Sequence, residues 1–175
     1  MNITNSTECT VTQSKDFDER FERAFGLLAF ASNRFVLNHM RRICVELEMD
    51  LESTLIWGTL AQMNVLANVP IDADPMVMLD EIGLKKDIKL QPLRLSDLTQ
   101  ITGLPRETVR RKLDRLAKIG KVQRTEDGKW VYVREAIGLL ERQFTKQSVV
   151  NLLSTANSLQ SILEAVDIKQ KIESE

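Results

Sequence analysis

The sequence predicts a mainly helical protein with one small β-hairpin, and three observations lead to this fold class. Apolar residues recur at steps of three and four along most of the chain, which is typical of amphipathic helices. One short segment, residues 121–134, has instead the pattern of two strands around an Asp-Gly turn. The chain has 175 residues, 43% of them hydrophobic, which is enough to bury a core in one domain with helical extensions.

The composition excludes several classes of protein. Two cysteines, Cys9 and Cys44, cannot form a disulfide framework, and a single histidine, His39, removes most metal-site and catalytic-triad chemistry. No Gly-rich phosphate loop or nucleophile motif occurs, no apolar run approaches a membrane span, and residues 1–15 lack the features of a signal peptide. We therefore expect a soluble cytoplasmic protein that is not an enzyme, needs no metal or cofactor, and begins with a disordered tail at residues 1–15.

Two helices are predicted before residue 71. The first spans residues 16–47, where phenylalanines recur on one apolar stripe. The second spans residues 50–68, with Asp50 as its N-cap and Pro70 after its end. We group residues 16–70 as N-terminal helices that serve dimerisation. Residues 71–92 contain two prolines and a glycine and form a connector of uncertain structure.

Two short helices joined by a glycine turn are predicted next. After an extended piece at residues 93–95, Ser96 is expected to cap a helix that ends at Gly103. Pro105 fits the first position of a second helix, which stops at Gly120. Two helices connected in this way form a helix-turn-helix. The side chains that the second helix would bury are Val109, Leu113 and Leu116.

A β-hairpin follows the second helix. Asp127-Gly128 is a strong signal for a two-residue turn, and such a turn would pair Val122 with Val133. The extended piece, the two helices and the hairpin together predict a winged helix-turn-helix at residues 93–134. The hairpin would be its wing.

The C-terminal segment, residues 135–175, is predicted to be helical and to serve dimerisation. Its apolar residues step by three and four as in a heptad stripe, and they are Val149, Leu152, Ala156, Leu159, Leu163 and Val166. We expect this helix to pack against the phenylalanine-rich first helix, and the two helices to form an oligomerisation platform. The residues expected at the dimer interface are Phe17, Phe21, Phe25, Leu28, Leu152, Leu159 and Leu163.

Charge is distributed unevenly although the net charge is only −1. Residues 85–134 carry 14 Lys and Arg against 6 Asp and Glu, whereas residues 1–84 carry a balance of −7 and residues 135–175 a balance of −2. A basic middle between acidic flanks indicates a unit that binds a polyanion. The alternative interpretation is a solvated charged surface.

The run LTQITGLPRETVRRKLDRL, residues 98–116, resembles the helix-turn-helix of bacterial winged-helix transcription regulators. Its PRETVRR core is similar to recognition helices of the GntR and IclR families. The order of helices before and after residues 93–134 is more similar to the MarR family. The resemblance implies a homodimer built from the terminal helices, in which each subunit offers one winged helix to double-stranded DNA at a palindromic operator.

In a helix-turn-helix the second helix lies in the major groove, and arginine there can bind guanine through two hydrogen bonds. The residues expected to contact bases are Arg106, Glu107, Thr108, Arg110 and Arg111. The residues expected to contact phosphates are Ser96, Thr99, Lys112, Arg115, Arg124 and Lys129. The competing interpretation is that the charged side chains of this helix pair with one another at its solvated face.

Two hypotheses of function follow. The first is a sequence-specific, homodimeric transcriptional regulator that is cytoplasmic and nucleoid-associated. The alternative is a winged-helix adaptor that binds other proteins without sequence-specific DNA binding. Charge reversal of Arg110 and Arg111 would discriminate between the two, because it should abolish DNA binding and spare a protein partner. A small-molecule effector has no support in the sequence.

Overall fold

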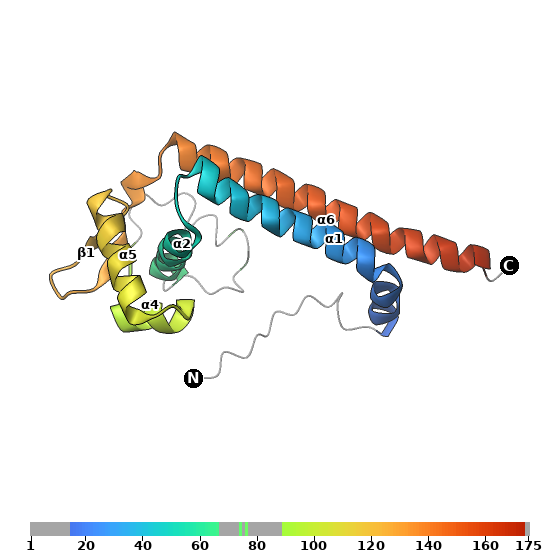
Figure 1. Cartoon of the computed structure of the whole chain (residues 1–175), viewed down its shortest axis with the longest axis horizontal. Helices are drawn as coiled ribbons and strands as arrows, with labels where there is room; N and C mark the ends of the chain where they lie inside the picture. Colours follow the sequence, from blue (N-terminus) through green and yellow to red (C-terminus); the bar gives the residue numbers. More distant parts are fainter. Residues whose placement is uncertain (1–14, 67–73, 75, 77–88, 174–175) are drawn as a thin grey trace. The chain divides into compact units, whose positions relative to one another are not determined.

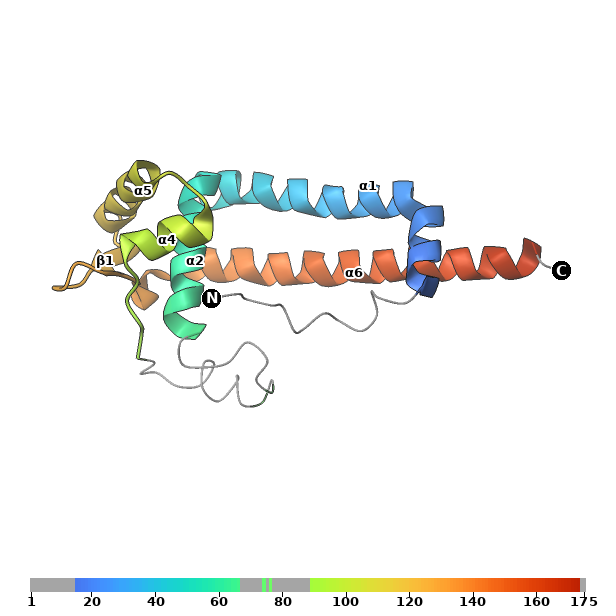
Figure 2. The ribbon, with the colours of Figure 1, turned by 90° about the horizontal axis from the view of Figure 1, so that it is seen from below.

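The structure is a computed structural model that describes residues 15–66, 74, 76 and 89–173. The described part is mainly helical with one two-stranded antiparallel sheet, which confirms the predicted class (Figures 1 and 2). The chain divides into two compact units, the described residues of Met1–Arg42 with Gln143–Glu175, and those of Ile43–Arg142. The predicted tail, apart from residue 15, and most of the predicted connector lie outside the described residues.

The first unit pairs two long helices, α1 (Lys15–Glu46) and α6 (Leu139–Glu173), which confirms the helix predicted at residues 16–47. At one end the guanidinium of Arg20 lies 3.2 Å from the carboxylate of Asp167. Toward the other end the guanidinium of Arg42 donates a hydrogen bond of 3.1 Å to the hydroxyl of Ser148. The two helices therefore run antiparallel and side by side (Figures 1 and 2).

Only the second half of the heptad stripe of α6 packs toward α1 as predicted. The first half of the stripe is exposed, with Val149 and Leu152 at 50% and 53%. The side of α6 that meets α1 carries Phe144, whose ring centre lies 5.5 Å from that of His39, and more polar residues such as Thr155. These positions lie roughly 100° around the helix from the stripe, because an α-helix turns about 100° per residue. Sequence periodicity identified the stripe, but it did not show that only half of the stripe meets α1.

The second unit is built around one apolar core. It contains α2 (Leu51–Leu66), α4 (Leu95–Thr102), α5 (Arg106–Lys118) and a hairpin of β1 (Val122–Arg124) and β2 (Trp130–Tyr132). The three predicted inward residues of α5 are all buried in it. The sequence analysis grouped α2 with the N-terminal helix, whereas the structure packs Ile56 and Leu60 of α2 into this core at 0% exposure. Helix α2 therefore supports α5 directly.

A buried asparagine ties α2 to two extended segments. The side-chain amide of Asn64 donates a 2.6 Å hydrogen bond to the carbonyl of Gln91. Its side-chain oxygen accepts a 2.9 Å hydrogen bond from the backbone N–H of Tyr132, and Asn64 is 0% exposed. Because buried polar groups are costly unless they are paired, this amide fixes where both segments lie against α2.

The hairpin differs from the prediction by one residue. Val122 pairs with Tyr132, so the predicted partner Val133 is wrong. The loop holds three residues, 126–128, and Gly128 has a φ of +80°. A three-residue loop commonly ends in a left-handed glycine after a type I turn. The Asp-Gly pair thus supplies the end of a three-residue loop, not a two-residue turn.

The helices of the second unit begin slightly differently from the prediction. Helix α4 starts one residue early and its N-cap is Arg94, so the predicted cap Ser96 is wrong. The carboxylate of Asp97 accepts a 3.0 Å hydrogen bond from the backbone N–H of Arg94, which satisfies this helix end. Pro105 is the N-cap of α5 and not its first residue. A short 3₁₀ helix, Arg134–Ala136, likewise precedes α6, which shortens the helix predicted from residue 135.

Candidate nucleic-acid interface

Helix α5 presents a basic line on the side opposite its buried residues. Val109 and Leu113 are 0% exposed, and about 180° around the helix from them lie Arg111 and Lys118. Arg111 and Lys118 are both exposed, and the side chain of Arg115 between them is 71% exposed, although its guanidinium also lies 3.9 Å from the carboxylate of Asp50. These three cations follow one another at i, i+4 and i+7, so one face of α5 offers a row of positive charge to the solvent. The opposite face of α5 is buried in the core of the second unit.

Arg110, predicted to contact bases, is held by two carboxylates. Its guanidinium donates to Glu107 at 2.9 Å and to Asp114 at 2.9 Å. The hydrogen bond that Arg110 donates to Glu107 raises the pKa of Arg110, and the same bond lowers the pKa of Glu107. The competing interpretation of a self-paired helix face therefore applies to Arg110 and Glu107. Arg111 has no ion pair within the described residues and is exposed, so it is the more available of the two arginines.

Lys112, predicted to contact a phosphate, turns toward α2 instead. Its ammonium lies 2.7 Å from the carboxylate of Asp50 and 3.2 Å from that of Glu52, and the side chain is 13% exposed. An amine held by two carboxylates and largely covered does not suit a phosphate contact. Lys112 anchors α5 to the beginning of α2, so it is not available for the predicted phosphate contact.

The carboxylate of Asp50 has two roles, because it caps α2 and also binds Lys112 of α5. It caps α2, as predicted, by accepting a 2.9 Å hydrogen bond from the backbone N–H of Ser53. Partial burial acts to raise its pKa, but the hydrogen bonds from Lys112 and Ser53 outweigh this effect. The pKa of Asp50 is therefore lowered from 3.8 to about 2.

The substitution Asp50→Asn is expected to make the free energy of unfolding depend less on pH between pH 7 and pH 2. A carboxylate with a lowered pKa stabilises the folded state above pH 4, and this contribution disappears as the pH falls toward 2. The shift corresponds to about 2.5 kcal/mol if unscreened. The side chain of Asp50 is 39% exposed, and solvent screening reduces the contribution to about 1 kcal/mol. Asparagine also caps helices well, so the substitution isolates the charge.

Urea unfolding of both proteins between pH 7 and pH 2 measures this effect. The free energies of unfolding should differ by about 1 kcal/mol at pH 7 and converge below pH 4. A difference that stays constant down to pH 2 would show that the ionised carboxylate of Asp50 contributes nothing.

The remaining predicted contact residues on α4 and α5 differ in how accessible their side chains are to the solvent. Arg106 is exposed at the start of α5, and Thr108 is half-buried. The hydroxyl of Thr99 donates a 2.9 Å hydrogen bond to the carbonyl of Leu95 in its own helix. Ser96 is exposed, and its hydroxyl lies 3.3 Å from the carboxylate of Asp97. Arg106 is therefore the most available of these four groups.

The two predicted contacts of the hairpin both make local interactions. The guanidinium of Arg124 donates to the carbonyl of Gly128 at 3.2 Å and lies 5.9 Å from the ring centre of Trp130. The ammonium of Lys129 lies 2.6 Å from the carboxylate of Asp127, and its hydrogen bond is the main cause that lowers the pKa of Asp127 to about 2. Arg124 is exposed and keeps donors toward the solvent, whereas Lys129 is largely neutralised.

Lys118 is a candidate that the sequence analysis did not assign. It lies seven residues after Arg111, which places the two side chains on the same face of α5. The spacing of basic residues outside the apolar positions could have identified it. The basic line of α5 is therefore defined as Arg111, Arg115 and Lys118.

Comparison with known proteins gives no further assignment: no protein-family model, curated protein or solved structure matches this chain. Across residues 15–66 and 89–173, no cluster of three or more His, Cys, Asp or Glu side chains could hold a metal ion. None of the helices described above has the length and apolar character needed to cross a membrane.

Proposed function

We propose that the protein is a homodimeric, sequence-specific DNA-binding transcriptional regulator, in which α5 enters the major groove of double-stranded DNA. The observation that carries this proposal is the basic line of α5, three exposed cations on one face of a helix whose opposite face is anchored in a core. A rigid helix with this distribution of charge can bring arginine to base edges and lysine to phosphates.

The order of elements in the second unit supports a winged helix-turn-helix as the finer fold. Leu93 exchanges two backbone hydrogen bonds with Trp130, at 3.0 and 2.8 Å, and so adds a third extended segment beside the hairpin. The chain thus runs helix, extended segment, two helices and hairpin. Gly103, in a left-handed conformation with φ +68°, makes the turn between α4 and α5. This is the order expected for a winged helix.

Within this proposal the contacts are reassigned from the geometry. Arg111 and Arg106 are proposed to contact bases, and a bidentate arginine–guanine pair discriminates by about 1–3 kcal/mol against other bases. Arg115 and Lys118 are proposed to contact phosphates, and Arg124 contacts the backbone from the hairpin. The carboxylates of Glu107 and Asp114 hold Arg110 and position it beside the groove.

The first unit supplies the argument for a homodimer. Between Arg23 and Arg41, α1 has one charged residue, Arg34. Residues 147–163 of α6 have no charged residue. Long uncharged stretches are unusual on a helix that faces water, and Phe25 of α1 is 56% exposed in one chain. Exposed apolar surface of this kind indicates a site where a protein partner binds.

One group of exposed apolar residues lies on one side of the helix pair, whereas Leu27, Phe30, Leu37 and Leu153 are exposed elsewhere on it. On each helix, the residues of this group are rotated about the helix axis by about 100° from the residues that contact the other helix. The rotation has the same sense on α1 and on α6. Because the helices are antiparallel, both displacements point to the same side of the pair. We call this surface the apolar face, and its members are Phe25, Val36, Met40, Val149, Leu152 and Ala156.

We propose that the apolar faces of two copies pack together as a four-helix arrangement. Of the residues predicted at the dimer interface, Phe25 and Leu152 belong to this face. Leu28 is only 5% exposed because it packs within its own chain, and Phe17 stacks on Phe21 at 6.0 Å between ring centres. Leu159 and Leu163 are half-buried at the edge of the face.

A single acidic substitution in the apolar face is expected to dissociate the dimer. Light scattering after size exclusion should give the wild type twice the chain mass of 20.0 kDa, and Leu152→Glu one chain mass. The matched control is Val150→Glu, which places the same change on the same helix at a 51% exposed position outside the apolar face. A wild type of one chain mass, or equal dissociation by both variants, contradicts the proposed interface.

Fluorescence anisotropy with a random-sequence duplex tests the DNA-binding proposal. The full-length protein should bind at 50 mM salt and lose about a thousandfold or more in affinity by 200 mM, because phosphate contacts release counterions. The result against the proposal is the absence of binding at 50 mM salt, or affinity that does not change with salt. The basic line would then serve a protein partner, which a pull-down would seek next.

A further inference from the structure

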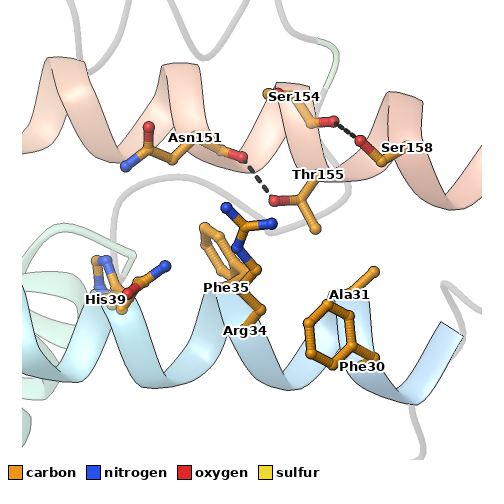
Figure 3. A pocket seen from close by; sticks show the side chains of 10 residues that line it. Phe30, Ala31, Arg34, Phe35, His39, Asn151, Ser154, Thr155 and Ser158 are labelled. Carbon is orange, nitrogen blue, oxygen red and sulfur yellow. Dashed lines mark hydrogen bonds between the residues drawn. The ribbon is translucent and has the colours of Figure 1, made fainter. Parts of the chain in front are cut away.

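The first unit contains a cavity of about 350 Å³ between α1 and α6 (Figure 3). Its walls include Phe30, Arg34 and Phe35 from α1, and Asn151, Ser154 and Thr155 from α6. Its volume lies in the range of small-molecule sites, roughly 300–1,000 Å³. Arg34 and Ser154 lie on the opposite side of the helix pair from the apolar face. A second copy on the apolar face would therefore leave the cavity open.

Arg34 gives the cavity a positive charge without a protein counterion. It forms no ion pair with any residue that the structure describes. The facing stretch of α6, residues 147–163, contains no Asp or Glu. Figure 3 shows its side chain extended from α1 toward Thr155 of α6. An anion in this cavity would meet a guanidinium whose planar donors match a carboxylate.

The polar wall offers a second donor, and one buried polar atom remains unsatisfied. The side-chain oxygen of Asn151 accepts a 2.9 Å hydrogen bond from Gln147, which leaves its NH₂ group to point toward α1 (Figure 3). Nδ1 of His39, which also lines the cavity, is buried and has no hydrogen-bond partner among the described residues. Buried polar atoms are normally paired, so this nitrogen adds an unused polar group to the wall of the cavity.

The rest of the wall is partly apolar and also includes Asn38 and Ser158. Phe30 and Phe35 contribute aromatic rings on the α1 side, and Phe30 is 67% exposed in one chain. An ion without an apolar part would leave these rings in water. The cavity therefore combines one cation and several polar side chains with an apolar surface, which fits a ligand that has both characters.

We propose that this cavity binds a small monocarboxylate with a compact apolar body. The carboxylate accepts from the guanidinium of Arg34 and from the amide of Asn151, and the apolar body lies against Phe30 and Phe35. One cation matches a monoanion, whereas a doubly charged phosphate would require more positive charge. The site lies wholly within the first unit, so it stands independently of the DNA-binding proposal.

Saturation-transfer difference NMR on the full chain tests the site with hexanoate as the probe. We expect a clear signal from hexanoate and a signal at least fivefold weaker from hexan-1-ol, which has the same chain length and no charge. Arg34→Gln, which removes the charge from an exposed residue, should reduce the hexanoate signal at least fivefold. The control Arg41→Gln, on the same helix and outside the cavity, should leave the signal unchanged.

A second variant separates the cavity from the rest of the apolar surface. Ser154→Phe places a ring in the cavity from the exposed side of α6, and it should also suppress the hexanoate signal. Circular dichroism should show unchanged helix content in all variants. An absent signal in the wild type, or equal signals in the wild type, Arg34→Gln and Ser154→Phe, would overturn the proposal.

Discussion

The double substitution Arg111→Glu/Arg115→Glu is expected to weaken DNA binding by about a thousandfold, which corresponds to about 4 kcal/mol. Arg111 is the arginine best placed for a base edge, and Arg115 the exposed cation next to it on the basic line. Loss of a bidentate base contact costs about 1–3 kcal/mol, and each new carboxylate repels the phosphates. Anisotropy with a duplex at 50 mM salt measures the change.

The matched control is Arg41→Glu/Lys146→Glu, which changes the net charge equally at exposed residues of α1 and α6. It should lower affinity far less than the change on α5. Arg110→Ala should also have a smaller effect than Arg111→Ala, because Glu107 and Asp114 already hold the guanidinium of Arg110. Equal losses from the control and from the double substitution would mean that binding follows net charge and not α5.

The second large effect is expected from Asn64→Leu, which should lower the free energy of unfolding by about 3 kcal/mol. Leucine is similar in size, but it leaves the N–H of Tyr132 and the carbonyl of Gln91 without their partner. An unpaired buried group costs about 1–3 kcal/mol. Urea unfolding followed by tryptophan fluorescence measures the loss, since Trp57 and Trp130 pack against the core of the same unit.

Gln62→Leu provides the control for this prediction. Gln62 is exposed on the same helix, so its substitution should change the free energy of unfolding by less than about 0.5 kcal/mol. Similar losses in both variants would show that the hydrogen bonds of Asn64 do not carry the effect. A loss confined to Asn64→Leu supports the structural role of this amide.

Local patterns in the sequence were sufficient to predict much of the second unit. The inward residues of α5 follow from a period of three and four, and Gly103 and Gly120 end their helices in left-handed conformations. Asp50 was identified as a cap because a cap depends on residues within one turn. Each of these features is decided by neighbours in the sequence, so no knowledge of the fold was required.

Features that depend on distant residues could not be predicted in this way. Lys112 was assigned to a phosphate because its partner Asp50 lies 62 residues earlier in the chain. The hydrogen bonds of Asn64 reach across 27 and 68 residues. The α6 stripe has a clear heptad period, but a period does not state which surface covers it. The hairpin register failed because Asp-Gly suits both two-residue and three-residue loops.

The most direct measurement of the central claim is photo-crosslinking of the full chain to a duplex from within α5. A benzophenone amino acid in place of Glu107 lies on the exposed side of α5 and retains every basic residue. The same group in place of Glu164, exposed on α6, is the control. The proposal predicts a crosslink to DNA from position 107 that disappears at high salt, and none from position 164. DNA binding without a crosslink from position 107, or with equal crosslinks from both positions, would contradict it.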